Sequence, residues 1–323
     1  MRSSIIPIFI THLGCPNNCV FCDQRQIASA EAPSADRVRE IIDKALEYAV
    51  RPQISFYGGS FTAIGNELME SYLKAAWPYV EDGRCDSIRL STRPDAIDPE
   101  RLEILKKYGV RTIELGTQSM ADHVLTASGR GHDAEATRRA SALIHEYGFE
   151  LILQMMVGLP GASIEDELYT AREICSLRPT GVRIYPTCVI GGTPLYEMYK
   201  RGIYKDLSID EAVDICADLL DIFEEKGIKV VRLGLNPTEE LSGGAVKAGA
   251  YHPALGEMVY SRRFLKDILK KAPNVPYEIL VPPRMLSIAI GQKKCNLEYL
   301  KNNTSLAAIK AQKGIEEPEI RII

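Results

Sequence analysis

The sequence predicts an α/β fold in which short parallel strands alternate with helices. Short runs of β-branched and apolar residues alternate with longer stretches of helical periodicity. Gly109, Gly148 and Gly227 follow three of the helical stretches, where a left-handed cap residue is favoured. Because short loops join each helical stretch to a strand on either side, the strands are expected to be parallel with right-handed crossovers. Six such units form either a partial TIM-like barrel or a doubly wound sheet.

The expected elements follow one another in a regular order along the first 235 residues. Strands are predicted at residues 5–11, 53–58, 87–92, 112–117, 150–157 and 181–186, and a seventh at 229–234. Helices are predicted at residues 34–50, 65–77, 98–108, 134–147, 163–176 and 208–226. In both architectures the functional residues lie at the C-terminal ends of the strands, so the residues directly after each strand are the candidates.

A change of pattern after residue 234 predicts two domains, at residues 1–235 and 236–323. Residues 236–249 are rich in small and polar side chains. A helix is expected near 255–271, a strand at 277–281, two short helices to about residue 302, and then a charged tail. The second unit is therefore expected to be a small α/β extension.

Composition restricts the function classes. The formal net charge of −4 and the pI near 5.9 give no general attraction to nucleic acid or to an anionic membrane, so an RNA site would need a local basic patch. No run of about 18 apolar residues is present, so we expect no contact with a membrane. We expect the protein to be cytoplasmic. In that compartment the eight cysteines are expected to be thiols, metal ligands or catalytic groups.

Three cysteines follow the first predicted strand with the spacing C-x3-C-x2-C, at Cys15, Cys19 and Cys22. Thiolates are the usual ligands of iron–sulfur clusters, and three of them leave one iron of a four-iron cluster without a protein ligand. Two alternatives remain at this point. One is a zinc site completed by His12, since structural zinc normally takes four ligands, and the other is a set of redox thiols.

The motif, with the aromatic Phe21 before Cys22, resembles the signature of the radical S-adenosylmethionine (radical SAM) superfamily. Over residues 8–202 the chain is similar to the radical SAM domain of the catalytic subunit of Elongator, and more distantly to oxygen-independent coproporphyrinogen dehydrogenase. The resemblance implies a partial (β/α)6 barrel, a [4Fe-4S] cluster on the three cysteines, and SAM beside Phe21. It also implies a low-potential electron donor of the flavodoxin or ferredoxin type.

The same resemblance suggests which residues contact SAM, all of them at or after predicted strand ends. It implies backbone contacts to the methionine amino group from the glycine pair after the second strand, Gly58 and Gly59. The next residue, Ser60, stands in place of the glutamate of many families. Ser91 stands where the Elongator family has glutamate. The implied SAM contacts, from amino group through ribose and carboxylate to adenine, are Phe21, Gly58, Gly59, Ser60, Ser91, Gln118, Arg130, Gln154 and Pro186.

Residue chemistry agrees with several of these assignments. Two glycines after a strand let the backbone approach a ligand closely. Gln154 lies in an apolar run, where a buried amide must find a hydrogen-bond partner. The fork of Arg130 suits a carboxylate. Arg93 and Asp95, after the third strand, are either an ion pair or a substrate contact.

The substrate is predicted from weaker features. The Elongator resemblance implies a tRNA wobble uridine, but we expect the chain to be without that family's acetyltransferase domain. A glycine-led turn after residue 290 resembles the backbone-gripping loop of KH domains, with Lys294 in place of its second glycine. The candidate RNA contacts are Arg262, Arg263, Lys266, Lys293 and Lys294.

Three functional hypotheses follow from these features. The first is a radical SAM enzyme that modifies tRNA or another RNA. The second is radical chemistry on a porphyrin-like molecule or another small metabolite. The third is a cluster-bearing binding protein without turnover.

Overall fold

The computed structural model describes residues 4–15, 19–23, 32–238 and 241–323. Its main feature is a seven-stranded parallel sheet whose strands lie side by side almost in chain order, β1-β2-β3-β4-β5-β6-β8. The strands are β1 (Ile5–Phe9), β2 (Gln53–Tyr57), β3 (Ser87–Thr92), β4 (Val110–Gln118), β5 (Glu150–Val157), β6 (Gly181–Pro186) and β8 (Lys229–Leu233). A doubly wound sheet would start in its middle and reverse direction, and this sheet does not. The partial TIM-like barrel is therefore confirmed, as an open half-barrel.

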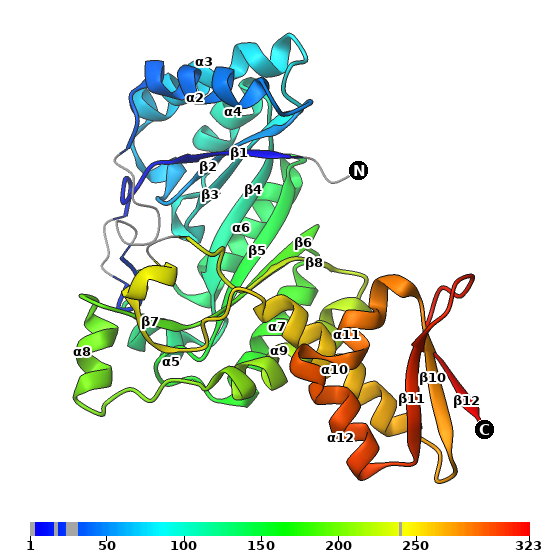
Figure 1. Ribbon diagram of the computed structural model, residues 1–323. Coiled ribbons are helices and arrows are strands. Elements are labelled where there is room, and N and C mark those ends of the chain that lie inside the picture. The colour runs from blue at the N-terminus through cyan, green and yellow to red at the C-terminus, as the bar shows by residue number, and fades with distance from the viewer. Residues whose placement is uncertain (1–3, 16–18, 24–31, 239–240) are drawn as a thin grey trace.

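Six helices join these strands and cover one face of the sheet. They are α2 (Ala35–Leu46), α3 (Asn66–Glu81), α4 (Pro99–Lys107), α6 (Ala134–Glu146), α7 (Ile164–Ser176) and α9 (Ile209–Glu225). Figure 1 shows α2, α3 and α4 together along one side of the sheet. Alternate strand residues point to opposite faces, so Ile113 and Leu115 of β4 are fully buried in the main core. Glu114, between them, faces the inside of the half-barrel.

Short elements that the sequence did not predict lie around the open end of the half-barrel. They are α5 (Asp122–Ala127), α8 (Pro194–Lys200) and the antiparallel pair β7 (Cys188–Ile190) and β9 (Val246–Gly249). Strands of three or four residues carry too little periodicity to stand out in a sequence. No helix in the part of the chain that the structure describes is long and apolar enough to cross a membrane.

The C-terminal residues form a separate lobe, seen in orange and red in Figure 1. It contains α10 (Leu255–Lys271), β10 (Tyr277–Val281), α11 (Leu286–Ile290), α12 (Cys295–Asn303), β11 (Leu306–Ala311) and β12 (Glu319–Ile322). Its sheet has the order β11-β10-β12, with β11 parallel and β12 antiparallel to β10. The segment after residue 302, which was expected to be a charged tail, instead contributes β11 and β12 to this sheet. Residues of modest strand propensity become strands here by pairing with β10.

Helix α10 connects the two units. Its first turns carry Leu255 and Val259 into the main core, whereas Phe264, Leu265 and Ile268 belong to a second core under the small sheet. One helix therefore contributes to both cores. The domain boundary at residues 235/236 stays a prediction.

Candidate metal and cofactor site

Two loops at the open end of the half-barrel interlock through glycines. Gly59, after β2, approaches the loop after β1 so closely that a Cβ there would lie 2.5 Å from the carbonyl oxygen of Leu13. Gly14 has φ +71°, and a Cβ on it would lie 2.3 Å from the carbonyl oxygen of Ser60. The Ser60 amide donates to the Leu13 carbonyl at 2.9 Å, which closes the contact. Only glycine fits at these two positions, so Gly14 and Gly59 together shape the loop that carries the cysteines.

The segment Cys19–Cys22 is hydrogen-bonded to Ser128, at the end of α5, and to Leu195, in α8. The Val20 amide donates to the carbonyl of Ser128 at 3.1 Å, and the Val20 carbonyl accepts from the amide of Leu195 at 2.8 Å. Phe21 packs against Met156 and other apolar side chains at the ends of β5 and β6. Cys15, Cys19 and Cys22 are therefore held over the open end of the sheet.

The cysteine chemistry fits an iron–sulfur cluster. Cys15, Cys19 and Cys22 are partly exposed, whereas Cys85, Cys188 and Cys216 are buried. Burial, followed by the neighbouring Cys19 and Cys15, raises the pKa of Cys22 to about 12. The thiolates of a four-iron cluster each bind a different iron, whereas a structural zinc ion normally takes four ligands at one metal.

Several of the predicted SAM contacts lie together. The Gln154 side chain donates to the side-chain oxygen of Gln118 at 3.0 Å, across neighbouring strands. Gln118 has φ 67°, an uncommon conformation for a residue other than glycine, which marks a strained position at the site. Arg130 donates to the Gly116 carbonyl at 2.7 Å and to the Cys19 sulfur at 3.2 Å, while its Nε is buried without a hydrogen-bond partner in the described structure. Arg130 therefore bridges the strand that carries Gln118 and the cysteine loop.

The other predicted contacts are placed less centrally. The Ser60 hydroxyl lies 3.6 Å from the Cys15 sulfur. Ser91 is on the inner face of β3, and Pro186 ends β6. The SAM roles of all these residues stay predictions.

Arg93 and Asp95 form the ion pair that was one of the two alternatives, with Arg93 Nε donating to Asp95 Oδ1 at 2.9 Å. His132 is buried nearby, and its Nε2 lies 3.3 Å from the Thr117 carbonyl oxygen. Burial, and then the charge of Arg130, lower the pKa of His132 to about 4. His132 is therefore neutral at physiological pH and contacts the end of β4.

Glu167 is a residue of the site that sequence analysis missed. This side chain, on α7, is 4% exposed and accepts a hydrogen bond from the amide of Gly158, directly after β5, at 2.8 Å. Tyr204 donates to the carbonyl of the same glycine at 2.7 Å. Glutamate is common in the first turn of a helix, so nothing in the sequence distinguished Glu167 from its exposed neighbours.

Burial raises the pKa of Glu167 from 4.5 to about 8, which gives a prediction about pH. Between these two values the folded protein holds a proton that the unfolded chain has lost. The free energy of unfolding should therefore fall by about 1.4 kcal/mol per pH unit as the pH rises through this window. Glu167→Gln keeps an acceptor for the Gly158 amide and should remove this slope, so that the variant is more stable than wild type at pH 8.

Urea unfolding at several pH values between 5 and 8 measures this effect. Glu165→Gln is the matched control, because Glu165 is exposed in the same helical turn and should leave the slope unchanged. An unchanged slope in Glu167→Gln would show that Glu167 is ionised when buried.

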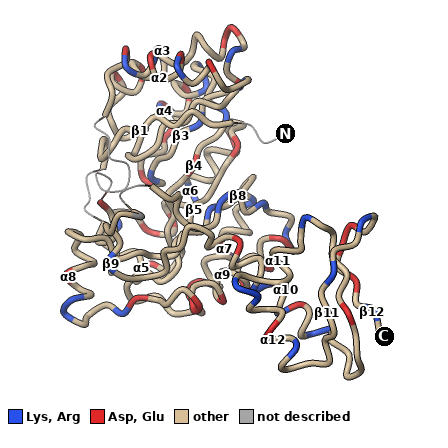
Figure 2. The backbone as a smooth tube through the Cα atoms, in the orientation of Figure 1, with Lys and Arg blue, Asp and Glu red and all other residues tan. Residues whose placement is uncertain are grey.

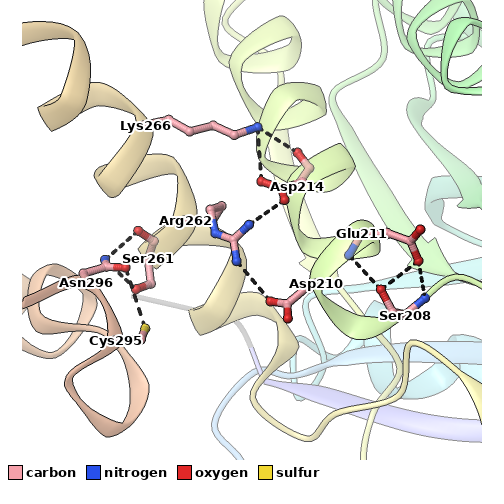
Figure 3. Close-up of polar contacts among 9 residues, drawn as sticks. All are labelled: Ser208, Asp210, Glu211, Asp214, Ser261, Arg262, Lys266, Cys295 and Asn296. Atoms are coloured by element: carbon pink, nitrogen blue, oxygen red, sulfur yellow. Dashed lines mark hydrogen bonds and ion pairs between the residues drawn. The ribbon is translucent and has the colours of Figure 1, made fainter. Parts of the chain in front are cut away.

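The candidate RNA contacts divide into two groups. Arg262 of α10 contacts Asp214 at 2.5 Å and Asp210 at 3.0 Å, and Lys266 of α10 donates to the Asp214 carbonyl at 3.2 Å (Figure 3). Lys266 also contacts Asp218 of α9 at 2.7 Å. Arg263 pairs with Asp221 and Glu224, so these three candidate side chains of α10 have acidic partners on α9. Figure 2 shows acidic and basic segments meeting where α9 and α10 lie. These contacts favour a structural role for the three residues, and their role in RNA binding stays a prediction.

Lys293 and Lys294 form the second group. They are exposed in the turn between α11 and α12, with φ values of 51° and 65°. Asn296 holds the base of this turn by donating to the carbonyl and hydroxyl of Ser261, both at 2.9 Å (Figure 3). The expected helix–turn–helix is present, and its grip on RNA stays a prediction.

Comparison with known proteins gives the family. The model described as "Radical SAM superfamily" matches residues 9–174, just over half of the chain, and the "Radical_SAM C-terminal domain" matches residues 179–264. A tRNA uridine(34) acetyltransferase of Methanocaldococcus infernus is 33% identical over 180 residues, which are 55% of this chain and 33% of that protein. Elongator complex protein 3 of Bos taurus is 30% identical over 188 residues, 57% of this chain and 33% of that protein. The chain thus spans about a third of the length of these two relatives.

Two further similarities cover more of the chain. An uncharacterized protein of Methanocaldococcus jannaschii is 29% identical over 231 residues, which are 67% of this chain and 70% of that protein. The solved structure of the archaeal M. infernus Elp3 with an N-terminal deletion has a TM-score of 0.66 at 24% identity, covering 83% of this chain and 63% of that one. That likeness shows a shared fold. Together with the family match, these findings show that this chain belongs to the radical SAM superfamily of enzymes.

Proposed function

We propose that the chain binds a [4Fe-4S] cluster on Cys15, Cys19 and Cys22 and uses it to cleave SAM reductively. When bound, the cluster and SAM together supply a 5′-deoxyadenosyl radical that abstracts hydrogen from a substrate. The observation that carries the proposal is the arrangement of three partly exposed thiols over the open end of a half-barrel, beside the Arg130 and Gln118–Gln154 contacts.

The residues of the chain have distinct tasks in this proposal. Arg130, already beside Cys19, presents its guanidinium to the methionine carboxylate, because an arginine fork matches a carboxylate. The paired amides of Gln118 and Gln154 orient the ribose hydroxyls. Phe21 and its apolar neighbours exclude water from the reacting carbon. None of these side chains has to move a proton in the hydrogen abstraction.

The test is anaerobic reconstitution with iron and sulfide, reduction, and measurement of 5′-deoxyadenosine by liquid chromatography. The proposal expects bound iron and SAM-dependent 5′-deoxyadenosine. Zinc at the three thiols, or iron binding without any cleavage of SAM, would overturn it. The second outcome would favour the non-catalytic, cluster-bearing protein.

We further propose tRNA as the substrate, since curated relatives at 30–33% identity are named as tRNA-modifying or Elongator proteins. Repeating the cleavage assay with bulk tRNA tests this proposal, which expects RNA to stimulate 5′-deoxyadenosine formation or to acquire a modification. A small-molecule substrate predicts no response to tRNA.

The turn between α11 and α12 gives a sharper prediction about tRNA. The double variant Lys293→Ala/Lys294→Ala should weaken tRNA retention and lower the slope of log K against log salt by roughly one to two units, because each lysine that contacts a phosphate releases about one counterion. Arg262→Ala/Lys266→Ala is the matched control of equal charge. Its side chains are already paired with α9, so the salt slope should stay unchanged. Equal effects of the two double variants would contradict a specific role for the turn.

A further inference from the structure

A buried charged cluster lies on the inner face of the half-barrel, below the residues expected to contact SAM. It consists of Tyr57, Arg89, Glu114 and Arg183, and is called the inner cluster below. In the strand register Glu114 lies beside Ser91, and Arg183 lies beside Gln154. Because Gly116 is the partner of Gln154, Glu114 is two residues further from the open end along β4. A substrate that enters the half-barrel beneath SAM would meet this cluster.

Glu114 is the centre of the inner cluster. Its Oε1 accepts hydrogen bonds from the hydroxyl of Tyr57 at 3.2 Å, from Arg89 Nη1 at 3.1 Å and from Arg183 Nη2 at 3.0 Å. Arg183 also donates to the hydroxyls of Tyr57 and Tyr185, each at 3.2 Å. The Glu114 side chain is 5% exposed and each arginine side chain 13%, so the two guanidinium groups are brought together in a largely desolvated place.

The charges of the inner cluster do not cancel, because two guanidinium groups face one carboxylate. Arg89 Nε is buried and has no hydrogen-bond partner among the described residues. Another acidic side chain on this face is Glu150, at the start of β5, and Thr112 donates to it. Arg232, beside Arg183 in the register, adds another positive charge and donates to the Gly234 and Leu235 carbonyls. An excess buried cation with a free donor is costly unless an anion completes it.

We propose that the inner cluster is an anion-binding subsite for the substrate, in which Arg89 and Arg183 take a phosphate or carboxylate group and Glu114 holds the two guanidinium groups in position. Arginine forks match the oxygens of both kinds of anion. The inference rests on the proposed function, which brings a substrate to the inner face of the half-barrel. It adds that the substrate carries an oxyanion within reach of the hydrogen that is abstracted.

The experiment uses anaerobically reconstituted protein saturated with SAM, so that the SAM carboxylate is already bound. Inorganic phosphate is titrated at constant ionic strength, and its binding is measured as the rise of the urea unfolding midpoint. Arg89→Gln should raise the dissociation constant for phosphate about tenfold or more, because a guanidinium group is lost. Glu114→Gln should lower the dissociation constant, because this substitution removes the competing negative charge. Arg89→Lys should keep part of the affinity. A purely structural ion cluster predicts lower stability in the variants but no such opposite changes in phosphate affinity.

Three further probes identify the source of the anion. Stabilisation by uridine 5′-monophosphate but not by uridine supports a nucleotide phosphate, and stabilisation by propionate supports a carboxylate metabolite. The inference is overturned if none of the anions stabilises the protein, or if Arg89→Gln leaves their effect unchanged. No turnover is measured, so this result is independent of whether SAM is cleaved. Conversely, absent 5′-deoxyadenosine would refute the proposed function without deciding whether the anion binds.

Discussion

Cys19→Ala is expected to abolish both cluster binding and the formation of 5′-deoxyadenosine. Each of the three thiolates is expected to bind one iron of the four-iron cluster, so losing one leaves two. Cys19 is also the thiol to which Arg130 donates. Removing it takes away a ligand and leaves the Arg130 guanidinium without one of its two partners. Iron and acid-labile sulfide in the anaerobically reconstituted protein, and 5′-deoxyadenosine after reduction, should all fall to background.

The matched control is Cys295→Ala in the C-terminal lobe. Cys295 is exposed, and its sulfur makes a weak contact at 3.7 Å with the side chain of Asn296. This variant should keep the iron content and SAM cleavage of the wild type. Retention of a full cluster by Cys19→Ala would show that the three-cysteine motif is not the ligand set, and the proposed function would fail.

Glu114→Ala is expected to cause a large loss of stability, about 3–5 kcal/mol in the free energy of unfolding. Glu114 accepts hydrogen bonds from Tyr57, Arg89 and Arg183 inside the sheet. Without it, two buried guanidinium groups face each other with no counter-charge. Urea unfolding at pH 7 measures the loss, and added phosphate should restore part of it if the inner cluster binds anions.

A surface carboxylate provides the comparison. Glu40 pairs with Arg37 on α2 at 2.5 Å, but both side chains are 63% exposed. Glu40→Ala should therefore cost no more than about 0.5 kcal/mol, because water and mobile ions screen the pair. If Glu114→Ala cost as little as Glu40→Ala, water would have to reach the inner cluster freely.

The sequence determined the elements that depend on local pattern. The strands at residues 87–92, 150–157 and 181–186 were predicted with the boundaries that the structure has, because a buried strand between helices is a short apolar run with clear ends. The cysteine motif is recognisable from the spacing of three cysteines within eight residues. It predicted the superfamily whose model matches the chain.

The inner cluster left a signal that was not used. Arg89, Glu114 and Arg183 are charged residues inside predicted strands, out of phase with the apolar residues that form the core. Such a pattern indicates that a sheet has a polar inner face. It does not say which charges meet, because the three residues come from different strands.

Tertiary structure alone decided which distant residues lie together. The choice between a half-barrel and a doubly wound sheet depends on strand order, and therefore on pairing between segments far apart in the chain. The acidic partners of Arg262 lie 48 and 52 residues away on α9, and β11 becomes a strand only beside β10. Local propensity acts within a few residues, whereas these contacts exist only after the chain has folded and brought the partners into reach.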